Sequence, residues 1–422
     1  MPTRRQFLTR AAGAGLVGAT SGLVGRGPGA AAPSARKFLF VFCKGGWDPT
    51  WVFAPMMGNE GVYVEPTATV ATAGGLTYVD GENRPAVKAF FEAHADRTAF
   101  FNGFEVRSVT HERCRRLLLT GTTQAAADDW ASRIAAADPS YLLPHVVISG
   151  PVFTSETTSS VLRVGETGQL SDLLDGSVLE RAEPPRSPLD DLVTGRIDTF
   201  LAAREDRWAA AAGPGRPEVF ARDLLRVRDQ IDTVLGIEGL DLGITVNGAA
   251  TPVSDRVEPA IELLARGYAR CATVAHLGWF NTTWDNHEDL DQQADHYQTL
   301  FTDLDAILQS LASRAGTAGG ATLADETVVV VWSEMGRGPV LNSARGKDHW
   351  TFTSAMLIGP GVRGGAVIGG YDTSFVGRPL DLTTGELRDD GVRATAENLG
   401  ATLLALADVD PGALAPVGAL LG

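Results

Sequence analysis

A continuous run of apolar, mostly β-branched residues from Thr327 to Trp332 (TVVVVW) constrains the fold of this chain more than any other stretch. Runs of this kind form strands that are covered on both faces, as in a parallel sheet packed between helices. The run stops at Ser333-Glu334, and the GRGP sequence that follows shortly after predicts a loop. A carboxylate therefore stands at the carboxyl end of a buried strand, the edge at which open α/β sheets bind their ligands.

Other apolar runs predict further strands, and amphipathic stretches between them predict helices. We expect strands at residues 37–43, 98–104, 145–149, 271–279, 327–332 and 354–358. We expect helices at residues 82–95, 111–120, 255–270, 290–315 and 394–407. Strands that alternate with helices predict an α/β fold with a doubly wound, mostly parallel central sheet and helices on both faces.

The region at about residues 151–252 differs from the rest of the chain. It holds a Pro- and acid-rich segment, two amphipathic stretches and a Gly-rich stretch, and no motif that carries chemistry. We interpret it as a mostly helical insertion, a candidate cap over the sheet edge. A chain of this length fits one large domain with insertions as well as it fits two domains; we expect a single α/β domain over residues 36–422.

The first 35 residues have the composition of a signal peptide. Arg4-Arg5 precede an apolar stretch without acids and a tail of small residues. The form TRRQFL resembles the twin-arginine export signal, and Ala32 and Ala35 are both candidate cleavage sites. Because no later stretch is apolar for long enough to span a bilayer, we expect no stable membrane anchor. The predicted partner is the twin-arginine export machinery, and the predicted destination is the periplasm or the outside of the cell.

Composition excludes two classes of protein. The chain carries 51 acidic residues against 36 lysines and arginines, a net charge of −15, and loss of residues 1–35 with their four arginines takes it to −19. Binding to a phosphate backbone needs a basic face, so nucleic acid is not an expected partner. Three cysteines are too few for a disulfide framework, although a single bridge is left open. The oligomeric state is not defined by the sequence.

Acids and histidines follow the predicted strands repeatedly. They are Asp48, Asp285, His287, Glu334, Asp348 and His349. Several such groups at one edge of a sheet repel one another unless a cation lies among them. Carboxylates and imidazoles together suit a borderline divalent ion such as zinc or manganese. The pattern therefore predicts a metal site.

Two hydroxyl residues, Ser108 and Thr110, precede a predicted helix that begins at His111 and ends before Gly121. The free amides and the dipole of a helix N-terminus favour an anion and can lower the pKa of a hydroxyl nucleophile. Ser and Thr are also the commonest residues that cap a helix. A capping role and a catalytic role therefore both stay open.

Six motifs follow one another along the mature chain. They are the GGWD turn at 45–48, Thr110-His111, WDxH at 284–287, SE-x-GR at 333–337, Asp348-His349 and Gly364-Gly365. Their order resembles the alkaline phosphatase and sulfatase superfamily. The chain is most similar, over nearly its whole mature length, to a twin-arginine-exported bacterial branch that is described only as a domain of unknown function.

The resemblance implies a metal-dependent hydrolase of a small-molecule or polymeric phosphate or sulfate ester. It implies one or two divalent ions, with zinc as the first candidate and manganese or calcium as the others. Arg337 and Lys347 are candidates to bind the charge of the ester, and surface salt bridges account for both equally well. The implied catalytic residues are Thr110 or Ser108 as nucleophile, His111 and Arg337. The implied ligands are Asp48 and Glu334 for one ion and Asp285, His287 and His349 for the other half of the site, with Asp348 as a further candidate.

Two departures from the superfamily pattern leave other functions open. Glu334-Met335 stands where the superfamily has Asp-His, so one expected histidine ligand is missing. The residues after Cys114 are Arg115, Arg116 and Leu117, which do not match the cysteine motif of ordinary sulfatases. The alternative is a non-catalytic, sulfatase-like protein that binds a cell-envelope polymer or a partner protein. A third reading is hydrolysis by bound water without a protein nucleophile.

Overall fold

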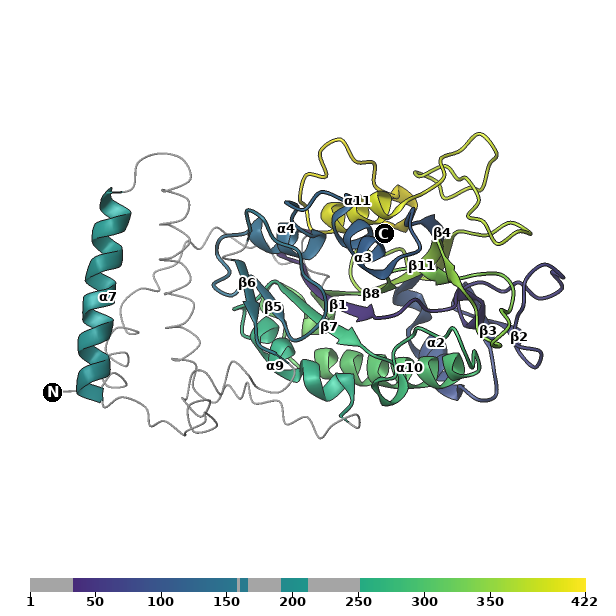
Figure 1. Cartoon of the computed structure of the whole chain (residues 1–422), viewed down its shortest axis with the longest axis horizontal. Coiled ribbons are helices and arrows are strands. Elements are labelled where there is room, and N and C mark those ends of the chain that lie inside the picture. Colours follow the sequence, from purple (N-terminus) through teal and green to yellow (C-terminus); the bar gives the residue numbers. More distant parts are fainter. Residues whose placement is uncertain (1–32, 158–159, 166–190, 212–250) are drawn as a thin grey trace. The chain divides into compact units, whose positions relative to one another are not determined.

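The computed structural model describes residues 33–157, 160–165, 191–211 and 251–422. Its central element is an eight-stranded sheet with the order β12-β4-β11-β8-β1-β7-β5-β6 (Figure 1). The strands are β1 (Lys37–Cys43), β4 (Thr98–Glu105), β5 (His145–Val147), β6 (Val161–Arg163), β7 (Cys271–His276), β8 (Thr327–Ser333), β11 (Phe352–Ile358) and β12 (Ala366–Gly369).

Strand β11 runs against the direction of its two neighbours, and the other paired strands of the sheet are parallel. It pairs antiparallel with both β4 and β8, whereas β1 pairs parallel with β7 and β8 on either side. The first strand is buried along its whole length, as the apolar run predicts. The predicted fold class, a doubly wound and mostly parallel sheet between helices, is confirmed.

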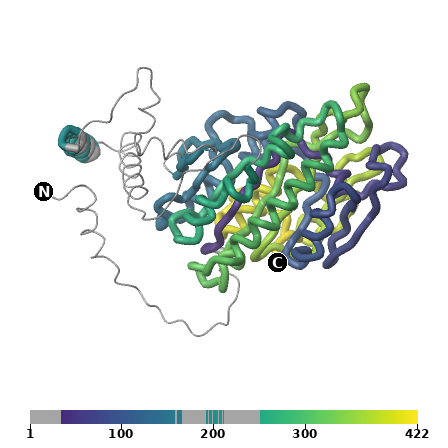
Figure 2. The backbone as a smooth tube through the Cα atoms, turned by 90° about the horizontal axis from the view of Figure 1, so that it is seen from below, coloured from purple at the N-terminus to yellow at the C-terminus, as the bar shows by residue number. Residues whose placement is uncertain are grey.

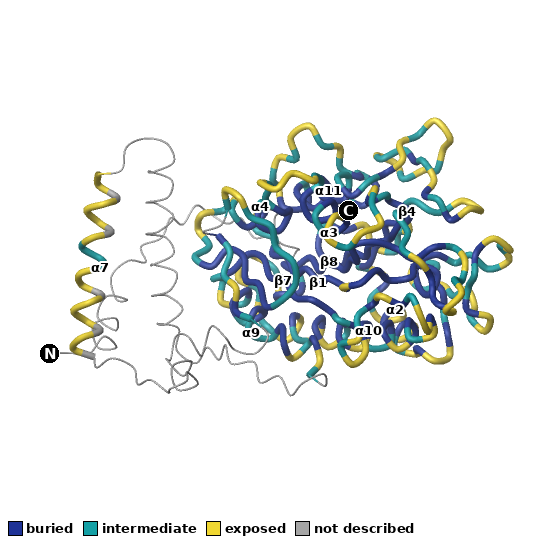
Figure 3. The backbone as a smooth tube through the Cα atoms, in the orientation of Figure 1, coloured by how far each residue is buried: buried dark blue, intermediate teal, exposed yellow. Residues whose placement is uncertain are grey.

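Helices cover both faces of the sheet (Figures 1 and 2). Alternate residues of β1, namely Phe38, Phe40 and Phe42, share one core cluster with residues of the helices on one face, because side chains of a strand alternate between its faces. The strands form the buried interior of this unit (Figure 3). The helices of that face are α3 (His111–Thr120), α4 (Trp130–Ala136) and α11 (Ala396–Leu406). Those of the other face are α2 (Pro85–His94), α9 (Val253–Ala265) and α10 (Gln292–Ala312).

Several elements of the structure are not predicted from the sequence. Helix α4 is one, and the edge strand β6, inside the region interpreted as a mostly helical insertion, is another. A separate hairpin joins β2 (Thr69–Ala73) to β3 (Leu76–Asp80) through Gly74-Gly75, which both have positive φ. Its first strand, TVATA, has Val70 as its one large apolar residue and therefore lacks the apolar signal on which strand prediction depends. The edge strand β12 is only four residues long and contains Gly369.

The chain divides into two compact units. One consists of Pro28–Glu166 and Thr245–Gly422 and contains the sheet; the other consists of Met1–Gly27 and Thr167–Ile244. The described part of the second unit is helix α7 (Asp191–Ala211). Most of the predicted signal peptide and of the predicted insertion lies outside the described residues, so both stay predictions. Within the described part of the chain, no helix is long and apolar enough to cross a membrane. The cysteines Cys43, Cys114 and Cys271 are all buried and free.

Three of the described histidines, His145, His276 and His296, are buried in the core, and burial lowers the pKa of two of them. His145 lies between the hydroxyls of Ser132, 3.2 Å away, and Thr273, 2.8 Å away. His296 accepts a hydrogen bond from the amide of Trp279 at 2.8 Å. Burial lowers the pKa of both of these imidazoles to about 3.

Acid should therefore destabilise the folded chain well above the pH at which carboxylates titrate. The pKa of both histidines is lower in the fold than the ordinary 6.5, so the unfolded chain binds more protons as the pH falls below that value. We expect the free energy of unfolding to fall by about 1.4 kcal/mol per pH unit for each histidine. Urea unfolding between about pH 7 and pH 5 measures this slope. His145→Gln should remove the share of one histidine, and an unchanged slope in that variant would contradict the assignment.

Candidate metal centre

The loops after β1, β7 and β8 meet at the carboxyl edge of the sheet. Gly45 allows the first two loops to approach closely, because a Cβ at this position would lie 2.7 Å from the amide nitrogen of Asp285. Its φ of +127° is a second reason why only glycine fits there. The GGWD turn therefore brings the β1 loop against the segment that carries Asp285 and His287.

The later Asp-His pair reaches the same edge by another route. Gly336–Arg337 (β9) pairs antiparallel with His349–Trp350 (β10), and Arg337 lies opposite His349. The chain then enters β11, which begins at the edge where the parallel strands end because it runs in the opposite direction. His349 thus lies between the end of β8 and the start of β11, which are at the same edge of the sheet.

Three histidines converge on the carboxylate of Asp285. Its Oδ2 lies 3.1 Å from Nε2 of His111, and its Oδ1 lies 3.1 Å from Nε2 of His349. Donor atoms of these three residues all lie within 4.8 Å of one another. Nε2 of His287 is 3.3 Å from the same Oδ1 and 2.8 Å from Nε2 of His349. Three donor side chains, His111, Asp285 and His349, therefore face one point, and His287 lies beside them.

The outer nitrogen of each imidazole faces an oxygen that only accepts hydrogen bonds. Nδ1 of His349 lies 2.7 Å from the carbonyl oxygen of Val109, Nδ1 of His111 lies 3.0 Å from Glu334 Oε1, and Nδ1 of His287 lies 3.4 Å from Asp348 Oδ1. These contacts place a proton on Nδ1 and leave Nε2 with a lone pair in the neutral ring. Histidines that bind metals have this arrangement, with the second nitrogen donating to a carboxylate or a backbone carbonyl.

The inward-facing atoms carry too many lone pairs to lie together without a proton or a cation. Burial alone would raise the pKa of Asp285, but hydrogen bonds from His111, His349 and Arg337 hold this pKa far below its usual range. Hydrogen bonds to Asp285 and Glu334 raise the pKa of His111 to about 9. Without a metal, a proton on His111 offsets the negative charge of Asp285 and Glu334. A divalent cation at the same place would offset that charge instead. The residues therefore fit a metal ion.

Glu334 lies behind His111. Its side chain is fully buried, and both of its oxygens accept a hydrogen bond from the amide of Gly45, at 3.1 and 3.0 Å. The remaining contact to Nδ1 of His111 orients the imidazole. Asp348 has the same relation to His287 and is itself held by Nδ2 of Asn342 at 3.2 Å. The sequence predicts both carboxylates as direct metal ligands. In the structure each contacts Nδ1 of a histidine whose Nε2 faces the cluster, so each lies behind a candidate ligand.

Arg337 and Asp48 are also completely buried. Arg337 donates to Asp285 Oδ1 at 2.6 Å and to backbone carbonyls, so it fixes the carboxylate and presents no surface to an ester. Asp48 pairs with Lys347 at 2.7 Å and accepts hydrogen bonds from Thr50. Among the contacts of the described residues, none joins the side chain of Asp48 to the histidine cluster.

The predicted nucleophiles lie at the start of α3, beside the cluster. Thr110 is the residue before the helix, and its hydroxyl does not cap the helix amides. Ser108 Oγ lies 3.4 Å from Thr110 Oγ1, in an exposed position. The carbonyl of Val109, between them, contacts His349. The structure therefore brings both hydroxyls next to a candidate ligand, at a helix N-terminus.

The parts of the site that sequence reasoning missed are mainly backbone groups. The amide of Gly45 and the carbonyl of Val109 carry no signal in the residue type. Asn342, whose side chain bonds both the carbonyl of His287 and the carboxylate of Asp348, lies in an unremarkable polar loop. Only contacts across the fold identify these groups.

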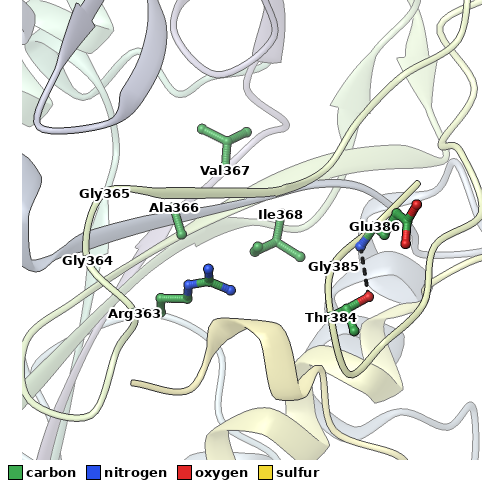
Figure 4. A pocket seen from close by; sticks show the side chains of 9 residues that line it. All are labelled: Arg363, Gly364, Gly365, Ala366, Val367, Ile368, Thr384, Gly385 and Glu386. Atoms are coloured by element: carbon green, nitrogen blue, oxygen red, sulfur yellow. Dashed lines mark hydrogen bonds between the residues drawn. The ribbon is translucent and has the colours of Figure 1, made fainter.

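A separate cavity of about 410 Å³ lies over β12 and contains none of the predicted site residues (Figure 4). It includes the Gly364-Gly365 turn that contributed to the resemblance. A Cβ on Gly364 would lie 1.7 Å from the carbonyl oxygen of Asp96, and Gly365 has a φ of +69°. These glycines are therefore required for close packing of the turn, and no charged group of the histidine cluster reaches them.

Comparison with known proteins gives a family match and distant structural likenesses. A family model described as a protein of unknown function (DUF1501) matches residues 221–415, a little under half of the chain. No curated protein matches the chain.

Three of the similar solved structures serve as examples. The lipoteichoic acid synthase LtaP from Listeria monocytogenes is 9% identical, with 92% of this chain and 76% of that chain covered and a TM-score of 0.40. The C-terminal periplasmic domain of EcEptC from Escherichia coli, in complex with Zn, is 9% identical, with 90% and 86% covered and a TM-score of 0.40. BT1596, a 2-O GAG sulfatase, is 12% identical, with 90% and 72% covered and a TM-score of 0.34. At such identities and scores the likeness says nothing about the chemistry of this chain.

Proposed function

We propose that this chain is a metal-dependent hydrolase of phosphate or sulfate esters. The observation that carries the proposal is the convergence of three imidazole Nε2 atoms on Asp285, each imidazole backed through Nδ1 by an acceptor oxygen. Such backing fixes the ring orientation and raises the basicity of a ligand. The buried guanidinium of Arg337 pairs with Asp285 Oδ1 and fixes the orientation of this carboxylate.

The metal would be held by His111, Asp285, His287 and His349. A set of imidazoles with one carboxylate favours zinc over manganese and disfavours calcium, which prefers oxygen ligands. A bound zinc ion polarises an ester oxygen and makes a hydroxyl or water more nucleophilic at neutral pH. With Asp48 paired to Lys347 and Glu334 behind His111, the donor set supports one ion.

The start of α3 would bind and attack the ester. The first amides of a helix lack intrahelical partners and point out of its N-terminus, where they bind anions such as a phosphoryl or sulfuryl group. Thr110, whose hydroxyl is exposed and not engaged as a cap, is the proposed nucleophile, with Ser108 as the alternative. His111 follows directly and holds a proton between Asp285 and Glu334 in the chain alone.

Export is part of the proposal. The Arg4-Arg5 signal would direct the folded chain through the twin-arginine route to the periplasm or beyond, where a small-molecule or polymeric ester would be its substrate. Loading of zinc before export is consistent with a route that carries folded proteins. Replacement of both arginines by lysine should leave the full-length chain in the cytoplasm, as fractionation would show.

The test combines metal analysis with ester turnover. Protein purified without chelator or metal-affinity tag should contain about one zinc per chain and hydrolyse an aryl phosphate or an aryl sulfate. Thr110→Ala should lose roughly 10³-fold or more in kcat while it keeps the metal. Ser108→Ala tests the alternative nucleophile, and a comparable loss of kcat in that variant with Thr110→Ala still active would assign the attack to Ser108.

The outcomes separate the alternatives. Activity that survives in both hydroxyl variants, with the metal present, means that bound water is the nucleophile. A stoichiometric metal without turnover of any ester leaves a sulfatase-like protein that binds a polymer or a partner. Absence of any transition metal from the purified chain rules out the hydrolase.

A further inference from the structure

A second cavity, of about 360 Å³, is built by the first half of the connection from β7 to α10. The second half of that connection supplies Asp285 and His287. The lining comes from the end of β7, the segment before α9 and one face of α10, where Gln298 and Thr302 lie one turn apart. A cavity of this size falls within the range of small-ligand pockets, about 300–1,000 Å³.

The floor of the cavity holds an imidazole nitrogen without a hydrogen-bond partner. His276 is only 1% exposed, and among the described residues no group meets its Nε2 in hydrogen-bonding geometry. The nearest acceptor, Asp303 Oδ2, lies 3.4 Å away without hydrogen-bonding geometry and accepts from the amide of Val253. Because Nδ1 of His276 accepts from the amide of Gly278, the neutral ring carries its proton on Nε2. A buried donor at the floor of a cavity calls for an acceptor from a ligand.

The rim of the cavity carries two exposed aromatic rings. Trp279 is 40% exposed and Phe280 is 57% exposed, and their rings meet edge to face at 4.5 Å. Phe280, Asn281 and Thr283 all have positive φ, a conformation that costs about 1 kcal/mol or more for a residue other than glycine. The amide of Trp279 is nevertheless fixed by His296. The loop therefore holds its aromatic rings outward at a cost in stability.

The chemistry of the lining selects a neutral, hydroxyl-rich ligand. Asn281 offers an amide at the edge of the cavity. Gln298 and Thr302 add polar surface that is already partly engaged, because Gln298 Oε1 accepts from the amide of Ala86, Gln298 Nε2 donates to Thr302 Oγ1, and Thr302 donates to the carbonyl of Gln298. The two buried charged groups of the lining, Arg256 on α9 and Asp303 on α10, have opposite signs, so the cavity offers no net charge that would favour a second phosphate or sulfate. Aromatic faces beside amides, hydroxyls and an imidazole suit a pyranose ring, which presents an apolar C–H face and hydroxyls that both donate and accept.

One buried side chain connects the cavity to the metal centre. The indole N–H of Trp284 donates to the carbonyl of His276 at 3.2 Å, and the Trp284 carbonyl accepts from Arg337 at 3.1 Å. The residue that follows is Asp285. Since one short connection thus builds both sites, we propose that the cavity binds an uncharged sugar unit of the substrate while the ester lies at the metal. The position of the ester rests on the proposed function. The sugar site rests on the cavity alone.

The probes that test it are three neutral disaccharides, cellobiose, maltose and chitobiose, observed by saturation-transfer NMR at millimolar concentration. At least one should receive saturation from the wild-type chain, and Trp279→Ala should weaken the transfer roughly tenfold or more. Trp208→Ala is the matched control, because this tryptophan on α7 is 42% exposed and lies outside the cavity. Phe280→Ala provides a second rim variant if Trp279→Ala has a lowered melting temperature.

The sugar assignment and the ester assignment fail in different ways. Turnover of an aryl phosphate should be the same in Trp279→Ala as in the wild type, because this ester has no sugar unit to occupy the cavity. Sugar binding without any ester turnover would overturn the proposed hydrolase and keep the sugar site. Absence of saturation transfer with all three probes, or transfer that is undiminished in both rim variants, would overturn the sugar site.

Discussion

Asp285→Ala should purify without zinc, whereas the wild-type chain should carry about one equivalent. The two oxygens of Asp285 are the point on which His111, His287 and His349 converge, and they supply the negative charge that the imidazoles lack. Removal of one of four ligands should weaken zinc binding by roughly 100-fold or more, about 3 kcal/mol. Elemental analysis of the purified variant and competition with a chromogenic chelator measure the loss.

Three other variants make this test specific. Asp285→Asn keeps an acceptor for the buried Arg337, so it separates loss of the metal from damage to the fold. Glu334→Gln should weaken binding only about 10- to 100-fold, because it acts through the orientation of His111. Asp305→Ala removes a carboxylate that pairs with a different histidine, His94, and should keep the metal. A full equivalent of zinc in Asp285→Ala would mean that the convergent histidines are not the metal site.

The central sheet could be predicted because its strands are apolar on both faces. The runs at 37–43 and 327–332 correspond to β1 and β8 within one residue. A strand that is apolar on both faces is buried in the middle of a sheet with helices on both sides, so the apolar run itself marks the strand. The direction of β11 could not be predicted. Its sequence, FTSAMLI, is equally apolar whichever way it runs, and only its pairing with β4 and β8 defines it as antiparallel.

The members of the site could be predicted better than their roles. Asp285, His287 and His349 were expected together because acids and histidines at one sheet edge imply a shared cation, and the structure brings them into contact. The roles depend on partners that are distant in the chain. Glu334 accepts a hydrogen bond from the amide of Gly45, which lies 289 residues away in the sequence. Lys347, in the loop before β10, pairs with Asp48, in the loop after β1. A strand-end acid looks the same in the sequence whether it faces a metal, a histidine or a lysine.

Lys347→Met should destabilise the fold by about 3–5 kcal/mol, because it leaves the charge of Asp48 buried without a partner. Both side chains are fully buried and their charged atoms lie 2.7 Å apart. The Lys347 ammonium also donates to the carbonyl of Tyr63 at 2.9 Å, which loses its partner as well. Urea unfolding of the variant and of the wild type measures the difference in free energy.

Two comparisons decide what the loss means. Lys88→Met removes a lysine that is 55% exposed and 4.0 Å from Glu92, so it should cost less than about 1 kcal/mol. In Asp48→Asn/Lys347→Met the uncompensated charge is gone, and much of the lost stability should return because breaking a buried pair costs more than replacing it. A Lys347→Met variant as stable as Lys88→Met would mean that the Asp48 charge has found another cation. If the zinc content then rises to two equivalents, Asp48 is a metal ligand after all, and the single-ion centre around Asp285 is only half of the site.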